Sequence, residues 1–138
     1  MILQLLRYLH HDQLIEEPAH DADLTLLDYL RDHKNLAGTK EECASGDCGA
    51  CTVVIAQLAT TEDGKTELVY RSVNSCISFA ATLHGKQLIT IENLQENDRL
   101  HPAQQCMVDY HASQCGFCTP GFVTVSYTHL TLPTIYSV

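Results

Sequence analysis

Four cysteines limit what this chain can fold into more than any other feature of its sequence. Cys43, Cys48 and Cys51 lie in one short segment, and Cys76 follows after a gap of 24 residues. The spacing C-x4-C-x2-C followed by a distant cysteine is the plant-type ligand pattern of a [2Fe–2S] cluster. We therefore predict that these four thiolates hold one such cluster, which requires the fold to bring Cys76 back to the loop.

The residues between the clustered cysteines suit a loop that wraps closely around a small inorganic core. All of them except Asp47 have small side chains, and Gly46 and Gly49 can adopt a positive φ without a steric penalty. Such a loop can turn successive backbone N–H groups inward. Because the cluster is an anion that becomes more negative on reduction, those donors help to set its reduction potential.

Two other uses of cysteine compete with this interpretation. Zinc also takes four thiolates, and the chain contains two C-x2-C pairs, Cys48/Cys51 and Cys115/Cys118. These pairs are separated by 63 residues, whereas a zinc ribbon separates them by roughly 15–20. Zinc also gives no role to Cys43. A disulfide framework is disfavoured, because we find no secretory segment and the loop is too short for internal pairing without strain.

Composition and charge exclude several classes of function. The 138 residues suffice for one domain and the beginning of a second, and 45% of them are hydrophobic. The net charge of −9 makes nucleic acid and anionic membrane surfaces poor partners. No apolar run approaches the roughly 20 residues of a membrane-spanning helix. Thiolate ligands without an export signal predict a cytoplasmic protein.

Hydrophobic periodicity predicts an α+β fold in the first part of the chain. Residues 1–9 fit either a helical face or strand alternation, but a turn at 10–12 and a short segment after it favour a hairpin. A helix is predicted from Thr25 to Lys34, because Thr25 and Asp28 form a capping-box-like start.

The following segments complete a sheet. We predict strands at 51–58, 67–71 and 87–91, a turn at 62–65, and a helix capped by Asn74 or Ser75 that carries Cys76 and stops at Gly85. A mixed sheet with one long helix and a cluster loop is a β-grasp arrangement.

The composition changes after Leu94. A polar linker at 95–99 precedes a helix that opens at His101-Pro102 and places Ala103, Met107 and Tyr110 on one face. Cys106 lies near this apolar face and is predicted to be a core thiol. Thr119 followed by Pro120 predicts the start of another helix. The eight histidines form no i, i+4 pair, so we expect solvated or capping roles for them.

Three motifs in this order resemble the iron–sulfur portion of molybdenum hydroxylases, in particular the small subunit of bacterial xanthine dehydrogenases. They are G-T-K-E-E-C running into G-D-C-G-A-C-T-V at 38–53, V-N-S-C at 73–76, and Q-C-G-F-C-T-P-G at 114–121. The resemblance covers about residues 1–123. It implies a plant-type ferredoxin-like domain over 1–94 and the start of a helical [2Fe–2S]-binding domain over 95–124.

The resemblance also implies an electron-transfer role. In this family, electrons pass singly from a molybdenum–pterin centre through two [2Fe–2S] clusters to FAD and then to NAD or oxygen, in purine or aldehyde oxidation. Cys43, Cys48, Cys51 and Cys76 correspond to the first cluster, Cys115 and Cys118 to half of the second, and Gln114 to a residue near the pterin. The implied partners are the FAD domain and the molybdenum-binding subunit.

The chain also departs from the family pattern. The family completes the second cluster with a downstream C-x-C motif, which this sequence lacks. We therefore expect a chain truncated just after Phe122, in which that cluster does not assemble. Cys115 and Cys118 could alternatively form a redox dithiol at a helix N-terminus. The Thr- and Ser-rich residues 125–138 do not fit the expected helix, and we predict a foreign or disordered tail there.

Overall fold

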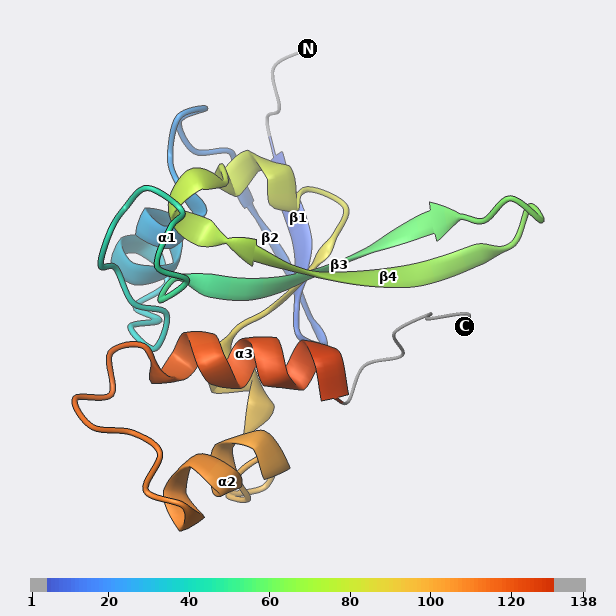
Figure 1. Ribbon diagram of the computed structural model, residues 1–138. Helices are drawn as coiled ribbons and strands as arrows, with labels where there is room; N and C mark the ends of the chain where they lie inside the picture. The colour runs from blue at the N-terminus through green and yellow to red at the C-terminus, as the bar shows by residue number, and fades with distance from the viewer. Residues whose placement is uncertain (1–4, 131–138) are drawn as a thin grey trace.

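Residues 5–130 are described in the computed structural model, and they form an α+β fold around a five-stranded mixed sheet (Figure 1). The strand order is β2-β1-β5-β3-β4, with β1 and β5 parallel and the other neighbours antiparallel. The strands are β1 (Leu5–His10), β2 (Gln13–Pro18), β3 (Thr52–Thr60), β4 (Thr66–Asn74) and β5 (Gln87–Ile89). The predicted α+β class with a mixed sheet is confirmed.

The first segment is a strand hairpin, as the turn at 10–12 indicated. Leu6 and Tyr8 are buried while their neighbours along β1 are exposed, which is the alternation of a half-buried strand. His11 adopts a positive φ of 54° between the two strands. Residues 1–4, which belong to the ambiguous segment 1–9, lie outside the described residues.

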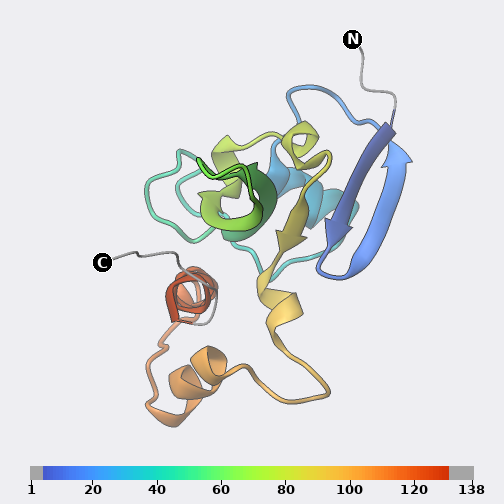
Figure 2. The same ribbon diagram turned by 90° about the vertical axis from the view of Figure 1, so that its right-hand side faces the viewer.

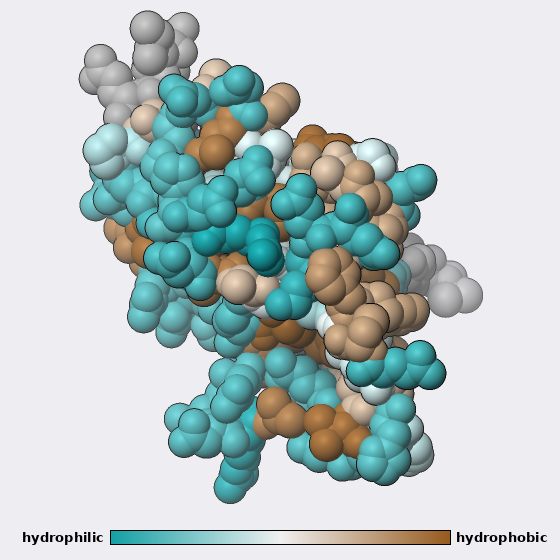
Figure 3. Space-filling model, turned by 90° about the vertical axis from the view of Figure 1, so that its left-hand side faces the viewer, coloured by the Kyte–Doolittle hydropathy of each residue, from teal (hydrophilic) through white to brown (hydrophobic). Residues whose placement is uncertain are grey.

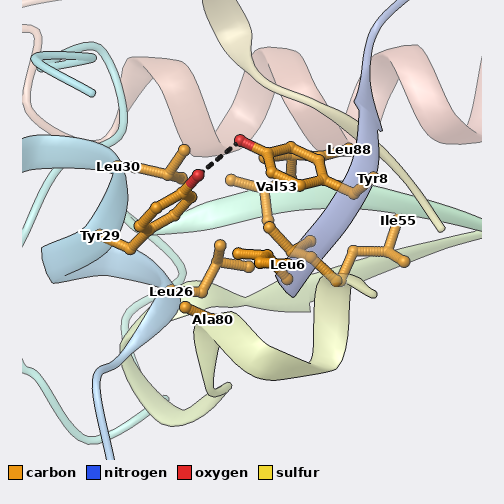
Figure 4. Packing of buried hydrophobic residues seen from close by; sticks show 10 residues of the cluster. Leu6, Tyr8, Leu26, Tyr29, Leu30, Val53, Ile55, Ala80 and Leu88 are labelled. Carbon is orange, nitrogen blue, oxygen red and sulfur yellow. Dashed lines mark hydrogen bonds between the residues drawn. The ribbon is translucent and has the colours of Figure 1, made fainter. Parts of the chain in front are cut away.

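A short helical segment covers one face of the sheet. It consists of α1 (Leu26–Asp28) and the π-helical turn η1 (Tyr29–His33), and it begins where predicted because the Thr25 side chain accepts a hydrogen bond from the Asp28 N–H. Leu26, Tyr29 and Leu30 are fully buried against residues of β1, β3 and β5. Figure 4 shows this core, in which the hydroxyls of Tyr8 and Tyr29 are 2.9 Å apart.

The β3–β4 hairpin is the longest feature of the sheet, and its far end projects beyond the rest of the molecule (Figure 1). The two predicted strands are confirmed, and β4 continues beyond the expected end at Arg71 to Asn74. The register pairs Thr52 with Asn74. Cys51 and Ser75, which adjoin these residues, therefore lie at the same end of the hairpin.

The predicted helix from Asn74/Ser75 to Gly85 is wrong. The segment forms two separate 3-10 turns, η2 (Ser75–Ile77) and η3 (Ala80–Leu83), joined by extended residues. Phe79 forms a β-bridge with Thr25, and flanking bonds join Leu26 N–H to Ser78 O at 2.6 Å and Ala80 N–H to Leu24 O at 2.9 Å. These long-range bonds replace the backbone bonds that a continuous helix would have made. The last strand is also shorter than predicted, because η4 (Ile91–Leu94) begins at Ile91.

The second part of the chain lies against the other face of the sheet. Helix α2 (Pro102–Asp109) begins at the predicted His101-Pro102, and α3 (Thr119–Leu130) begins at the predicted Thr119. Figures 1 and 2 show α3 beside the sheet and α2 on the side of α3 away from it. A second small core joins these layers and contains Val54, Ile89, Leu94 and Val123, with Ala103, Met107 and Tyr127 packed around it.

Three expectations for this part are wrong. Helix α3 does not end before residue 125 but continues to Leu130, because Thr128 is buried and accepts a hydrogen bond from Ser72 Oγ of β4 at 3.0 Å. Tyr110 does not join the apolar face of α2, since it follows the helix and is 80% exposed. Cys106 is exposed and is not a core thiol. Residues 131–138 of the predicted tail lie outside the described residues.

Within residues 5–130, no helix is both long and apolar enough to cross a membrane.

Candidate metal centre

The loop between η1 and β3 directs backbone N–H groups at the sulfur of Cys43. Its Sγ accepts from the N–H groups of Ser45 at 3.4 Å, Asp47 at 3.3 Å and Cys48 at 3.4 Å. Positive φ angles at Ala44, Gly46 and Gly49 produce this inward turn. The two glycines behave as predicted, whereas a left-handed conformation at Ala44 is unusual for a residue with a Cβ.

The structure also brings Cys76 to the loop. The Gly46 N–H donates to Cys76 Sγ at 3.2 Å, across 30 residues of sequence. Ser75 anchors the same segment, because its N–H and its hydroxyl both donate to the carbonyl of Cys51, at 3.2 Å and 2.7 Å. The gap in the sequence is therefore closed by the β3–β4 hairpin.

The thiols of the site differ in their environment. Hydrogen bonds from the Ser45 hydroxyl and from the N–H groups of Cys48, Ser45 and Asp47 lower the pKa of Cys43 to about 6. Burial, together with the neighbouring Cys51 thiol, raises the pKa of Cys76 to about 11. Cys51 is buried at the start of β3, whereas Cys48 is exposed. The Cys43 side of the loop is thus already arranged to stabilise a negative sulfur.

The donor set fits a two-iron cluster. Two thiolates per iron suffice for a [2Fe–2S] centre, whereas a structural zinc ion needs four ligands around one point. The inward N–H groups are the donors expected around an anionic cluster.

The other predicted site residues lie in the loop before α3. Gln114, Cys115 and Cys118 are exposed there. Cys118 lines a surface pocket that it shares with Cys48, so the structure places one cysteine of the second motif beside the first loop. Figure 3 views the side of the molecule that carries the cysteine loop and shows apolar side chains among polar ones at this surface.

Helix α3 approaches the cysteine loop closely at Gly121. A Cβ at this position would lie 2.4 Å from the carbonyl oxygen of Gly49, which is closer than atoms can pack. Only glycine therefore permits the observed contact between α3 and the loop.

Sequence reasoning missed the polar side chains that tie the loop to the hairpin. Asn74 and Ser75 are predicted to cap a helix, and no contact with the loop is predicted for them or for Thr52. In the structure Asn74 Nδ2 donates to the Gly46 carbonyl at 2.7 Å, and Thr52 Oγ1 donates to the Gly49 carbonyl at 2.7 Å. The signal that could have identified them is the register of the hairpin, which pairs Thr52 with Asn74.

Comparisons with known proteins agree with this geometry. Residues 9–81 match the family described as 2Fe-2S iron-sulfur cluster binding domain, and residues 90–133 match the [2Fe-2S] binding domain. A xanthine dehydrogenase of Blastobotrys adeninivorans is 49% identical over 106 residues, which are 77% of this chain and 7% of that protein. A probable aldehyde oxidase of Caenorhabditis elegans is 44% identical over 113 residues, 82% of this chain and 9% of that protein.

Solved structures show the same relationship. The aldehyde oxidoreductase from Desulfovibrio desulfuricans superposes with a TM-score of 0.73 at 28% identity, covering 91% of this chain and 12% of that one. Quinoline 2-oxidoreductase from Pseudomonas putida 86 superposes with a TM-score of 0.72 at 29% identity, covering 91% of this chain and 70% of the chain compared.

The chain belongs to the family of 2Fe-2S iron–sulfur cluster binding domains. More particularly, it is homologous to the iron–sulfur part of molybdenum hydroxylases of the xanthine dehydrogenase and aldehyde oxidase type. It spans less than a tenth of the length of the curated relatives named above.

Proposed function

We propose that Cys43, Cys48, Cys51 and Cys76 hold one [2Fe–2S] cluster, and that the chain transfers single electrons within a molybdenum hydroxylase. The observation that carries this proposal is the convergence of five backbone N–H groups on the sulfurs of three of these cysteines. When bound, such a cluster supplies reversible one-electron transfer. The inward N–H groups would stabilise the negative charge that the site carries.

The four cysteines would have unequal roles. Cys51 is buried and continues directly into β3, so it anchors the site to the sheet. Cys48 is exposed, and an electron could enter or leave the site on its side. Cys43 and Cys76 accept four of the five N–H hydrogen bonds. Most of the stabilisation of the negative charge by backbone donors would therefore act on these two sulfurs.

The other proposed components belong to the parent enzyme. A molybdenum–pterin centre in a second subunit or domain would be the electron donor, and an FAD domain would be the acceptor on the way to NAD. Cys115 and Cys118 would contribute half of the second [2Fe–2S] site, and Gln114 would lie toward the pterin. Since thiolate ligands must stay reduced, we place the protein in the cytoplasm.

The relatives of this chain include xanthine dehydrogenases and an aldehyde oxidase, so we propose the type of enzyme that they share. The proposed reaction of the parent enzyme is purine oxidation, and aldehyde oxidation is the alternative.

Anaerobic reconstitution with iron and sulfide tests the proposal. We expect a brown protein with about two irons and two sulfides per chain, visible charge-transfer absorbance and a rhombic paramagnetic signal after one-electron reduction. Cys76→Ser should abolish or severely weaken these signals. Cys106→Ser is the matched control, because Cys106 is an exposed thiol on α2 and should leave the iron content unchanged.

Metal analysis of the same samples separates this function from the alternative of a non-redox, zinc-stabilised interaction module. A colourless chain that binds about one zinc and unfolds on chelation would establish that alternative. About four irons per chain would contradict the proposed half site at Cys115 and Cys118.

A further inference from the structure

Asn74 is placed by the hairpin register against the middle of the cysteine loop. It is the last residue of β4 and pairs with Thr52, the first residue of β3, which follows Cys51 directly. Its side chain is half-buried and reaches the loop across 28 residues of sequence. In the sequence it stands two residues before Cys76, in the V-N-S-C motif.

The contacts of Asn74 determine how its amide is oriented. Nδ2 donates to the Gly46 carbonyl at 2.7 Å, and Oδ1 lies 3.4 Å from the hydroxyl of Thr52. A carbonyl can only accept, so the amide nitrogen must face Gly46. The Thr52 hydroxyl also donates to the Gly49 carbonyl at 2.7 Å, which ties both partners of the pair to the same loop.

The carbonyl that Asn74 holds belongs to the peptide unit between Gly46 and Asp47. In a planar trans peptide the C=O and the N–H point in opposite directions. Holding the Gly46 oxygen therefore directs the Asp47 N–H away from Asn74, and this N–H donates to Cys43 Sγ at 3.3 Å. The preceding peptide contributes the Gly46 N–H, which donates to Cys76 Sγ at 3.2 Å.

We propose that Asn74 is a positioning residue that sets the reduction potential of the site by fixing the Gly46–Asp47 peptide. The inference rests on the proposed function, because it concerns the cluster held by the four cysteines. N–H groups directed at the sulfurs stabilise the more negative, reduced state more than the oxidised one. Removing the Asn74 anchor frees this peptide to rotate, and reduction becomes less favourable.

Redox titration of the reconstituted full chain, followed by its paramagnetic signal, tests the inference. In Asn74→Ala we expect the equilibrium constant for one-electron reduction to fall about tenfold, which corresponds to about 59 mV toward more negative potential. Asn74→Leu retains the volume of the side chain without its donor and should shift the same way. Ser78→Ala is the control, because it removes a 3.0 Å bond to the Asn74 carbonyl without touching the loop, and its potential should equal that of the wild type.

Amide exchange measured by NMR on the iron-free chain provides a second readout. We expect the Asp47 N–H to exchange at least tenfold faster in both Asn74 variants and at the wild-type rate in Ser78→Ala. Unchanged potentials in variants that bind a full complement of iron would overturn the inference. If neither variant binds iron, the exchange rate of the Asp47 N–H is the test, and a rate equal to that of the wild type overturns the inference. A wild-type chain that binds no iron overturns the proposed function itself, and exchange then reports only whether Asn74 orients the peptide.

Discussion

Glu17 on β2 shows how a single residue joins two elements of this fold. Its carboxylate accepts hydrogen bonds from the Tyr29 hydroxyl and from the Lys34 ammonium, and His20 Nε2 lies 3.3 Å away. The Tyr8 hydroxyl in turn contacts that of Tyr29. Burial and the Glu17 carboxylate raise the pKa of Tyr29 far above its usual value, so this tyrosine remains a donor. These hydrogen bonds hold the hairpin of β1 and β2 against η1.

The same contacts predict how stability depends on pH. Burial by itself would raise the pKa of Glu17, but the hydrogen bonds from Lys34, Tyr29 and His20 outweigh it, and the pKa lies below its ordinary value of 4.5. A carboxyl whose pKa falls on folding stabilises the fold at neutral pH and loses that contribution as the pH decreases through this range. Glu17→Gln should therefore lower the free energy of unfolding by about 1–2 kcal/mol at pH 7, and the difference should shrink below about pH 4.5.

Urea unfolding at several pH values measures this effect. The neighbouring Glu16 provides a matched control, because its ion pair with Arg7 is exposed on both sides. Glu16→Gln should change stability by less than about 1 kcal/mol. Equal losses in the two variants, or a Glu17→Gln deficit that grows in acid, would contradict the role assigned to Glu17.

At the scale of elements, α3 is defined by its contacts with the sheet. Val123 and Thr124 are buried, and Thr128 contacts Ser72 of β4. These contacts explain why the helix continues through residues 125–130 despite their Thr- and Ser-rich composition. The closest contact is at Gly121, where α3 meets the backbone of the cysteine loop.

Gly121→Ala tests this contact because two effects oppose each other. Alanine favours a helix over glycine by up to about 1 kcal/mol, but its Cβ would lie 2.4 Å from the Gly49 carbonyl oxygen. Backbone cannot move aside as a flexible side chain can, so overpacking of about 1–3 kcal/mol should prevail and destabilise the protein. The shift of the denaturation midpoint relative to the wild type gives the sign of the change in stability. His129→Ala, on an exposed part of the same helix, should be neutral, and a stabilised Gly121→Ala would disprove the close approach.

At the scale of the whole molecule, the two parts differ in how well they are buried. The first core lies between the sheet and α1–η1, and ten of its residues are buried. Helix α2 has no buried residue among Pro102–Asp109. Phe122 is 64% exposed and Phe117 is 40% exposed, so this part presents large apolar side chains at its surface.

Hydrogen exchange followed by mass spectrometry should show this difference directly. We expect amides in the centre of β3 to be protected at least about 100-fold more than those of α2, because strands buried in a core open only with the whole domain. The exposed turn at residues 62–65 serves as the unprotected reference. Uniform protection across both parts would contradict this expectation.

The class of fold, the first hairpin, the starts of α1, α2 and α3, and the candidate cysteines could be predicted from the sequence, because these depend on local signals such as spacing, capping residues and alternation. Three features could not be predicted in this way: residues 75–85 form two turns, α3 continues past residue 124, and Asn74 contacts the cysteine loop. Each of these depends on a partner far along the chain: Thr25 for Phe79, Ser72 for Thr128 and Gly46 for Asn74. Local propensity carries no information about such partners, since the folding of the intervening chain brings them together.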